Sequence, residues 1–414
     1  MARNKPQIVV GLDIGTTKIC CVVGETDASG SLTILGSSLV PSAGIRRGVI
    51  ADIADAVAAI RDCKEEAELA SGVHIETVTV GITGEHLTSL NSKGVVAINN
   101  PAQEITADDV DRVMENARAI ILPPDREILH TIPRGFIVDG LDGVTRPEGM
   151  SGARLEADAH IVTGARTFID NVLKCVYAAG LQVEGGGVVL GPLATAEAVL
   201  LPAERDLGVL LLDIGGGTTD LAIFTNGAIA HTGVVPIAGE HVTRDIAVGI
   251  RVDPQEAERL KVDWGAGLTD LLLEDELVDV THLGEQSQSQ IPRSILAEVI
   301  EARMMELFEA VRDQIRKSGF GAQIPAGVVI TGGGSRLHGS DKAAQEILDY
   351  PVRIAIPSEQ IGVVDPVNNA RYATAVGLAR LAARAIRNVE PEEFVPRPRP
   401  RGLLGRLRQW LARS

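Results

Sequence analysis

The sequence predicts a two-lobed α/β protein, because one local pattern occurs twice along the chain. An apolar strand, a turn containing aspartate and glycine, and a second apolar strand appear first as VVGLDIGTTKICCVVG. They return about two hundred residues later as LLLDIGGGTTDLAIFTNG. Elsewhere strand patterns alternate with helical ones. Of the 414 residues 45% are hydrophobic and 23% charged, as in folded globular proteins, and only 3% are aromatic. The core must therefore consist mainly of Val, Ile, Leu and Ala.

The first part of the chain predicts a small sheet with one helix, followed by an inserted unit. Strand patterns cover residues 7–12, 18–24 and 76–82, and helical spacing covers 51–70. Residues 84–163 have a different, mixed sequence pattern. They combine a helix start (ITADD), a turn-rich stretch (RPEGMSGARLE) and a strand (AHIVTGA). We expect a small α+β subdomain inserted here.

The rest of the chain alternates again between strands and helices. Helical patterns cover residues 167–180, 193–201, 254–262, 294–317, 340–348 and 369–387, and strand patterns cover 185–191, 209–227 and 327–335. The prolines of EPEEFVPRPRPRG, residues 390–402, deny this stretch both helix and ladder hydrogen bonds. We expect it to be a stiff, extended linker.

The charge is distributed unevenly. The formal net charge is −16, yet the residues from Val395 onward contain six arginines and no acid. Because nucleic-acid binding depends on clustered Lys and Arg, the acidic body argues against nucleic acid as the main partner. The basic tail predicts a partner of its own.

Cysteine, histidine and the opening residues suggest neither a metal centre nor export. The four cysteines have no C-x-x-C spacing, and the eight histidines are scattered. We therefore expect reduced thiols in a cytosolic setting. MARNKPQ leads directly into a strand pattern, so we expect no secretory signal peptide.

Both repeated turns carry residues suited to a magnesium–nucleotide. Glycine lets backbone amides approach phosphate oxygens, threonine adds hydroxyl donors and lysine adds a charge. The first turn supplies Asp13, Gly15, Thr16, Thr17 and Lys18; the second supplies Asp213, Gly215, Gly216, Gly217, Thr218 and Thr219. Facing each other, the two aspartates, Asp13 and Asp213, would hold hydrated Mg²⁺. A third glycine run, Gly332, Gly333, Gly334 and Ser335, would let backbone lie against a base and ribose.

One such turn alone is a common hairpin, but two matched turns followed by a third glycine run favour a nucleotide clamped between two lobes. The Walker pattern G-x-x-x-x-G-K-[ST] and the dinucleotide pattern G-x-G-x-x-G are both absent from the sequence. The sequence therefore disfavours a P-loop enzyme and a Rossmann dehydrogenase.

At these turns the sequence resembles the actin/Hsp70/sugar-kinase ATPase superfamily and, within it, the FtsA family of bacterial division proteins. The most specific similarity lies in GEHL, EITADDV, ILHTIP and RPEGMSGARLEADAHI of the inserted segment, and in the C-terminal helix. The resemblance implies an actin-like fold with an alternative inserted subdomain in lobe one, ATP binding and assembly into filaments. It also implies anchoring of the tubulin-like protein FtsZ to the cytoplasmic face of the inner membrane, and recruitment of later division proteins.

These expectations divide the chain into six parts. Lobe one comprises 1–83 with 164–202 and 365–389, and the inserted subdomain, for self-interaction and division partners, 84–163. The lobe-two core comprises 203–236 with 318–364, its small subdomain 237–317, the linker 390–401 and the terminal helix 402–414.

The resemblance also implies roles for single residues of lobe two. Glu258 and Lys261, in EAERLK, match a pair that contacts ribose and adenine in related ATPases; an ordinary surface ion pair is the alternative. Arg303, in EVIEAR, matches the arginine of the subdomain that receives the C-terminal peptide of FtsZ. Gly191 stands where some relatives carry a catalytic Glu before Pro192. We therefore expect ATP to act mainly as an assembly ligand, with weak hydrolysis or none, and assign no catalytic residue.

The last residues, GLLGRLRQWLARS, predict an amphipathic helix at a membrane surface. On a helix one apolar stripe contains Leu403, Leu404, Leu407, Trp410 and Leu411, and Arg406 and Arg408 lie beside it. Tryptophan suits the headgroup boundary and arginine attracts anionic lipid. A helix docked on the protein's own body is the alternative.

Three other functions remain open from the sequence. A small-molecule kinase of the same superfamily would need a catalytic acid facing its substrate, for which we find no candidate, and would have no use for the tail. An FtsA-like pilus-assembly ATPase shares the inserted subdomain but not the linker and helix. A shape-determining actin relative fits less well, because the 84–163 insertion differs from its pattern.

Overall fold

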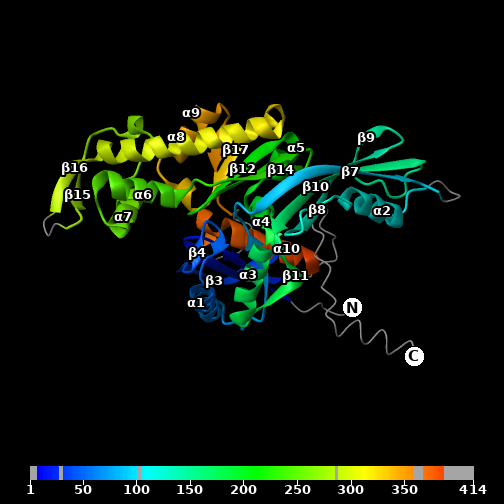
Figure 1. Cartoon of the computed structure of the whole chain (residues 1–414), viewed down its shortest axis with the longest axis horizontal. Helices are drawn as coiled ribbons and strands as arrows, with labels where there is room; N and C mark the ends of the chain where they lie inside the picture. The colour runs from blue at the N-terminus through cyan, green and yellow to red at the C-terminus, as the bar shows by residue number, and fades with distance from the viewer. Residues whose placement is uncertain (1–6, 28–30, 100–103, 285–287, 358–366, 387–414) are drawn as a thin grey trace.

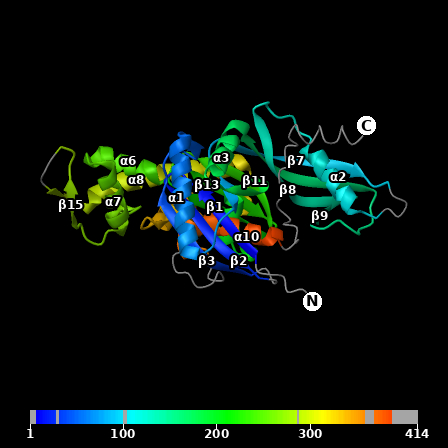
Figure 2. The same ribbon diagram turned by 90° about the horizontal axis from the view of Figure 1, so that it is seen from below.

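The computed structural model describes residues 7–27, 31–99, 104–284, 288–357 and 367–386. Two lobes lie against each other, and a third unit extends from them at one end (Figure 1). Seen from below, this third unit and the helices α6 and α7 lie at opposite ends of the molecule (Figure 2). The expected two-lobed α/β fold with an inserted subdomain is confirmed for the described residues.

The sheet of lobe one has five strands in the order β11-β6-β1-β2-β3. Their bounds are Gln182–Leu190, Thr77–Ile82, Gln7–Ile14, Lys18–Thr26 and Leu32–Pro41. The first three strands of the chain pair antiparallel, while β6 and β11 add parallel to them. Most residues of β1 and β2 are buried, as their apolar runs predict.

The sheet of lobe two repeats this topology in the order β14-β13-β12-β17-β18. The bounds are Ala228–Val235, Thr219–Thr225, Val209–Ile214, Val328–Thr331 and Val352–Ile354. Here too three antiparallel strands are extended by two parallel ones. The repeated sequence pattern is thus a repeated sheet, and its two turns join β1 to β2 and β12 to β13.

Helices of lobe one fill the space around its sheet and reach lobe two. They are α1 (Ile53–Ser71), α3 (Arg166–Ala178), α4 (Gly191–Val199) and α10 (Ala373–Ile386). A Cβ at Gly377 of α10 would lie 1.7 Å from the carbonyl oxygen of Ala194 in α4, so only glycine permits this crossing. All nine residues of α4 are buried, which places this short helix at the centre of the molecule.

Lobe two carries a small helical subdomain at its far end. The helices are α6 (Gly239–Ile250), α7 (Pro254–Trp264) and α8 (Arg293–Ser318), joined by the hairpin β15 (Leu277–Thr281) and β16 (Gln288–Pro292). Asp253 caps α7, and Gly319, with φ of 76°, ends α8. Two further helices, α5 (Pro202–Leu207) and α9 (Ser340–Leu348), pack against the lobe-two sheet region.

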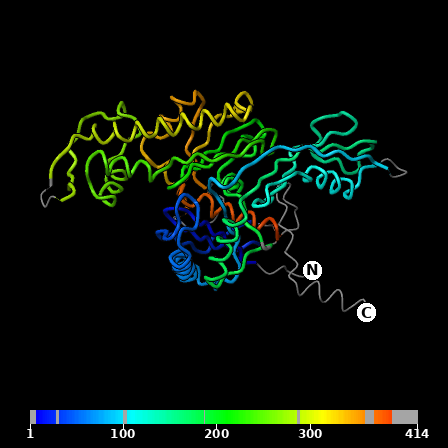
Figure 3. Tube along the Cα trace, in the orientation of Figure 1, coloured from blue at the N-terminus to red at the C-terminus, as the bar shows by residue number. Residues whose placement is uncertain are grey.

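The inserted unit has its own sheet and core. Its strands are ordered β7-β10-β8-β9, with bounds Leu87–Ala97, Arg154–Ala165, Arg126–Val138 and Leu141–Val144. Helix α2 (Ala107–Arg118) begins with a capping box between Thr106 and Asp109 and packs on this sheet. The path of the chain in Figure 3 shows how the long strands carry this unit away from lobe one.

The sheet of the inserted unit also contacts the edge strand β14 of lobe two. Ser89 donates to the carbonyl of Thr232 at 2.9 Å, and Asn91 donates to that of Ala230 at 3.1 Å. His160 is buried in this seam, with its ring nitrogens 2.7 Å from Asn91 Oδ1 and 3.1 Å from Thr232 Oγ1. The inserted unit therefore connects directly with both lobes.

The observed bounds follow the sequence patterns closely where a pattern was recognised, but the strands β3, β14 and β18 lie outside every expected range. The strand expected at 327–335 is shorter in the structure, because Gly332 turns the chain and 333–336 form a 3₁₀ turn. The sequence patterns do not predict the hairpin β15–β16 or the short hairpin β4 (Ile45–Arg46) and β5 (Val49–Ile50). Two-residue strands carry too little pattern to be recognised.

Candidate functional site

The two repeated turns have the same local geometry. The amide of Gly15 donates to the carbonyl of Lys18 at 2.9 Å, and that of Gly215 donates to Thr218 at 3.0 Å. At both glycines an added Cβ would lie 2.9 Å from that carbonyl, so each turn requires glycine there. The shared motif is therefore a backbone motif as well as a sequence repeat.

The two turns also touch one another. A Cβ at Gly216 would lie 2.3 Å from Thr17 Cγ2, and one at Gly217 would lie 2.6 Å from Thr16 Oγ1. Gly216 and Gly217 of the second turn therefore each fit closely against a threonine of the first turn. The structure brings the two expected phosphate turns together, as the repeat predicts.

Acidic side chains gather behind the turns. Asp13 pairs with Lys18 at 2.6 Å. Asp213 accepts hydrogen bonds from Thr195 of α4 and Thr374 of α10, at 2.9 and 3.0 Å. Burial raises the pKa of Asp213, and the nearby Asp13 raises it further. Burial alone would lower the pKa of Lys18, but Asp13 and its other neighbours raise it overall.

Asp220 is a third acid at this place, which the sequence analysis missed. It lies opposite Asp213 in the register of β12 and β13, and it is buried. Burial, with Asp213 as the next cause, raises its pKa well above the ordinary value. Its Oδ1 has no hydrogen-bond partner among the described residues. An acid within an apolar strand was the signal that could have identified it.

The third glycine run packs against the strand that bears Asp213. A Cβ at Gly332, whose φ is 85°, would lie 2.3 Å from Asp213 Oδ1, and one at Gly334 would lie 2.3 Å from Ile214 Cγ2. Ser335 is buried and donates to the carbonyl of Gly332 at 2.8 Å. Gly332 and Ser335 therefore shape the loop, while Gly333 and Gly334 line the open cavity beside it.

This cavity, of about 1330 Å³, extends from the turns to the small subdomain of lobe two. Among the expected residues it is lined by Thr17, Lys18, Gly215, Gly216, Glu258, Lys261, Gly333, Gly334 and Arg303. The other expected turn residues, including Asp13, Asp213, Thr218 and Thr219, are not part of this lining. Thr219 is buried and donates to the carbonyl of Ile237 at 2.7 Å, which is a structural contact.

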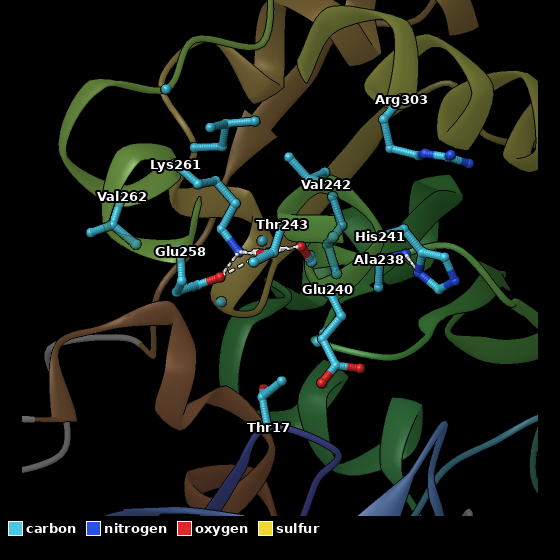
Figure 4. A pocket seen from close by; sticks show the side chains of 18 of the residues that line it. Thr17, Ala238, Glu240, His241, Val242, Thr243, Glu258, Lys261, Val262 and Arg303 are labelled. Atoms are coloured by element: carbon cyan, nitrogen blue, oxygen red, sulfur yellow. Dashed lines mark hydrogen bonds and ion pairs between the residues drawn. The ribbon is translucent and has the colours of Figure 1, made fainter. Parts of the chain in front are cut away.

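Glu258 and Lys261 form an ion pair, and both residues line the cavity. Lys261 Nζ lies 2.6 Å from Glu258 Oε2 and donates to Thr243 at 2.8 Å and to the carbonyl of Gly239 at 3.2 Å (Figure 4). Thr243 in turn donates to Glu258. The pair is therefore more than a solvated surface contact, because it ties α7 to α6 at the wall of the cavity.

Arginines that the sequence analysis did not select also line the cavity. They are Arg46 and Arg47 of the β4–β5 hairpin, Arg244 of α6, Arg293 of α8, Arg336 and Arg371. Of these, Arg293 pairs with Glu276 at 2.7 Å. The printed sequence offers no periodic signal for them, because they come from remote segments.

A bound magnesium ion would find oxygen donors here but no complete protein cage. Among the described residues, no group of three or more His, Cys, Asp or Glu side chains could hold a metal ion. Asp13, Asp213 and the orphaned Oδ1 of Asp220 nevertheless offer the hard oxygen atoms that Mg²⁺ prefers. The residues present therefore fit a hydrated ion held partly through water and phosphate.

Comparison with known proteins identifies the family. A family model described as cell division protein FtsA matches residues 210–377, and one described as the SHS2 domain inserted in FTSA matches 84–163. The cell division protein FtsA of Pseudomonas aeruginosa is 44% identical over 90% of this chain and 88% of its own length. That of Neisseria meningitidis is 40% identical over 97% of both chains.

The chain belongs to the FtsA family. A role in cell division follows from this membership, and the expected family resemblance is confirmed. Bacillus subtilis FtsA is a further relative, 39% identical over 93% of this chain and 85% of its own length.

Solved structures show the same actin-like fold at much lower identity. A PilM–PilN type IV pilus biogenesis complex matches with a TM-score of 0.66 and 19% identity, over 91% of this chain and 98% of that one. MreB5 of Spiroplasma citri bound to ADP matches at 0.54 and 15%, over 92% and 99%. The pilus-assembly and shape-determining alternatives thus share the fold, while the family is that of FtsA.

Arg303, the residue that the FtsA resemblance links to a peptide partner, has partners within the chain. Its guanidinium holds Asp245 of α6 at 2.5 and 3.0 Å, and it also contacts Glu306. The hydrogen bond to Asp245 raises the pKa of Arg303, against the effect of burial. Figure 4 shows the side chain on α8, beyond the Glu258–Lys261 pair.

Gly191, the position at which the sequence analysis expected no catalytic acid, lies in a crowded place. A Cβ there would be 2.3 Å from Thr83 Cγ2. A larger residue would therefore have to displace Thr83 at the end of β6. This FtsA-family chain has no room for an acid at that point of its present structure.

The apolar residues expected at the membrane, Leu403, Leu404, Leu407, Trp410 and Leu411, lie outside the described residues, as do Arg406 and Arg408. In the described part of the chain, no helix has the length and apolar character needed to cross a bilayer. The linker at 390–401 also lies outside the described residues.

Proposed function

We propose that this chain is an ATP-binding, filament-forming adaptor that links the FtsZ ring to the membrane. The observation that carries the nucleotide part is the contact between the two matched turns, Gly216 against Thr17, beside a cavity of about 1330 Å³. The MreB5 structures are described as bound to ADP and to AMPPNP, which supports the same ligand class here.

In this proposal the phosphates lie against the two turns. The amide of Gly216 and the hydroxyls of Thr16 and Thr17 donate to phosphate oxygens and Lys18 adds charge, while the amides of Gly15 and Gly215 close the turns themselves. Magnesium would neutralise phosphate charge and would be held through water by Asp13 and Asp213. The adenosine would lie toward Gly333 and Gly334, with its ribose near Glu258 and Lys261.

Hydrolysis is weak or absent in this proposal. Position 191 is glycine, so this chain lacks an acid there to orient a water molecule, and Thr83 leaves little space for one. Asp220 is buried and its raised pKa favours a protonated carboxyl, which is a poor base. ATP would therefore act chiefly by holding the two lobes in one arrangement.

Calorimetry on the intact chain tests nucleotide binding. We expect uptake of Mg-ATP by the wild-type chain and a large loss in Asp213→Asn, since that carboxylate faces the cation. Absence of heat with the wild-type chain would contradict the proposal. Phosphorylation assays on a panel of sugars and carboxylates would separate this function from that of a small-molecule kinase.

The FtsZ peptide is proposed to bind the small subdomain, 237–317, with Arg303 at or near the contact. Because Arg303 already holds Asp245, Arg303→Asp could act by disturbing the subdomain alone. The exchange Arg303→Asp with Asp245→Arg restores an internal pair while moving the charges. Peptide binding lost in both variants supports a direct contact; binding restored by the exchange limits Arg303 to an internal role.

The terminal segment 402–414 is proposed to bind an anionic membrane. Five large apolar side chains would contribute roughly 5–8 kcal/mol when partly buried, whereas ordering a dozen residues costs on the order of 1 kcal/mol each. One tail should therefore bind weakly, and a filament that presents many tails should bind firmly. Deletion of 402–414 should abolish co-sedimentation with anionic vesicles, while neutral vesicles serve as the matched control.

Self-assembly and the recruitment of later division proteins are assigned to the inserted unit, 84–163, at the septum. Electron microscopy on lipid monolayers, with and without ATP, tests polymer formation and its nucleotide dependence. Filaments on the monolayer with ATP are the expected result. Absence of filaments under all conditions would contradict the filament part of the proposal. It would not affect the nucleotide part, which calorimetry tests separately.

A further inference from the structure

The short hairpin β4–β5 projects two arginines into the cavity from lobe one. Arg46 and Arg47 both line it and both are exposed. Within the described residues neither has an ion-pair partner, whereas Lys18, Lys261 and Arg303 are all paired. The hairpin thus supplies unpaired positive charge to the cavity of an acidic protein.

The backbone of this hairpin is fixed at both its base and its tip. At the base, the carbonyl of Gly44 accepts from the amides of Ala51 and Asp52, at 2.7 and 3.0 Å. At the tip, the amide of Gly48 donates to Thr16 Oγ1 at 2.9 Å. The hairpin is therefore anchored directly on the first phosphate turn.

Arg47 has a backbone conformation that arginine rarely adopts. The loop has two central residues, Arg47 with φ of 49° and Gly48 with φ of 75°, and Arg46 pairs with Val49 across it. Two-residue hairpins with positive φ at both central positions favour Asn-Gly or Gly-Gly. A strained residue that the surroundings maintain is often one whose side chain is needed.

The two turns offer little unpaired positive charge of their own to a bound phosphate. Asp13 neutralises Lys18, and Glu240 of α6 points toward Thr17 across the cavity (Figure 4). A triphosphate at the turns would meet these acids with no unpaired lysine beside them in the described chain. Arginine suits this task, since its planar guanidinium binds phosphate through two parallel hydrogen bonds.

The tip of the hairpin also faces lobe two. Arg47 is one of the cations that lower the pKa of His241 on α6, after burial, Arg303 and Arg244. His241 itself lines the cavity. A phosphate held by Arg47 would therefore lie between the lobe-one hairpin and the start of α6.

We propose that Arg47, assisted by Arg46, contacts the terminal phosphate of a bound nucleoside triphosphate and so distinguishes it from the diphosphate. This inference rests on the proposed nucleotide site and assigns the hairpin a part in its specificity. ADP lacks the group that Arg47 contacts, so only the triphosphate gains this interaction.

The test uses Arg47→Asn in the full-length chain, titrated with Mg-ATP and Mg-ADP by calorimetry. Asparagine is favoured at this turn position, so Tm without nucleotide should stay equal or rise. We expect ATP affinity to fall about tenfold, as for one lost charge-assisted hydrogen bond, and ADP affinity to fall less than about threefold. A purely structural role for Arg47 could not raise Tm and weaken ATP binding together.

Two further variants make the result decisive. Arg47→Gly also accommodates the positive φ and should reproduce the loss of ATP preference. Arg316→Gln removes one exposed positive charge from the far end of α8 and should change neither affinity. An unchanged ATP-to-ADP ratio in Arg47→Asn and Arg47→Gly, with a wild-type chain that binds both nucleotides, overturns this inference alone. A wild-type chain that binds neither nucleotide overturns the proposed nucleotide site and this inference with it.

Discussion

The carboxylate of Asp213 in lobe two accepts a 3.0 Å hydrogen bond from Thr374 in helix α10 of lobe one. Thr195 of α4 donates to the same oxygen at 2.9 Å, and the two hydroxyls lie 3.0 Å apart. An acid proposed to face magnesium is therefore held in place by the opposite lobe. Asp213 thus links the strand β12 of lobe two to both α4 and α10 of lobe one.

Replacement of Thr374 by valine should destabilise the chain. Asp213 is half-buried, and its carboxylate would lose one of its donors, which costs about 1–3 kcal/mol when the acceptor stays in place. Chemical denaturation without nucleotide measures the loss. Thr131→Val is the matched control, because the Thr131 hydroxyl is buried without a partner among the described residues and its removal should be neutral or stabilising. Equal effects of the two substitutions would contradict a role for the Thr374 bond.

Replacement of Asp220 by asparagine should stabilise the chain without nucleotide, and more so as pH rises. The folded pKa of Asp220 lies well above its ordinary value of 3.8, so the folded chain binds more protons than the unfolded chain above that pH. Stability contributed by this group is therefore full below pH 3.8 and is lost as pH rises through the folded pKa. Asparagine does not titrate and escapes this loss.

Urea denaturation of wild type and Asp220→Asn between pH 4 and 8 measures this difference. The gap between the two free energies of unfolding should widen with pH in favour of the variant. Asp111→Asn, on the exposed side of α2, controls for the loss of one acidic residue. A gap that stays constant over the whole range would show that Asp220 carries no raised pKa.

Local sequence patterns sufficed for the turns because their geometry depends on nearby residues. Gly15 bonds to Lys18 and Gly215 to Thr218, each within four residues, so matched sequences form matched turns. The same holds for α8, whose apolar spacing spans residues 294–317 in the sequence and Arg293–Ser318 in the structure. Such features need no knowledge of the distant chain.

The remaining parts of the site could not be read from local pattern. Thr195 and Thr374 are 179 positions apart and meet only because α4 and α10 cross at Gly377. Arg47 comes from a hairpin with two-residue strands, which has no usable periodicity. Sequence reasoning therefore predicted the two matched turns with their own lysine and threonines, but not Arg47 or the hydroxyls of Thr195 and Thr374.

Acid should weaken the fold through His160, in the seam between the inserted unit and β14. Burial, with His231 and Arg134 among the nearby cations, lowers the pKa of His160 to about 3. The unfolded chain binds that proton near pH 6.5, so it holds more protons between these values. Stability is therefore lost as pH falls below 6.5, by about 1.4 kcal/mol per pH unit from this histidine.

Comparison of wild type with His160→Gln at pH 7, 6 and 5 tests this assignment. The variant should be less stable at pH 7, since Asn91 and Thr232 lose good partners, but its stability should fall less steeply toward pH 5. His130 and His86, each with a pKa lowered by burial to about 4, should maintain part of the slope in both proteins. His74→Gln at an exposed position is the control. Parallel curves for wild type and His160→Gln would contradict the assignment.

Gly216→Ala tests the contact between the two turns directly. The new Cβ would lie 2.3 Å from Thr17 Cγ2, so the turns must separate or Thr17 must move, at a cost of roughly 1–3 kcal/mol. We expect a lower Tm and weaker ATP binding, because both turns are proposed to hold the same phosphates. Gly135→Ala is the control, since a Cβ at Gly135 meets nothing within 4 Å. Thr17→Gly added to Gly216→Ala should recover much of the lost stability but not the ATP affinity, because it removes the crowded atoms together with a proposed phosphate ligand. Full stability and full ATP affinity in the single variant would show that the two turns do not act on one ligand.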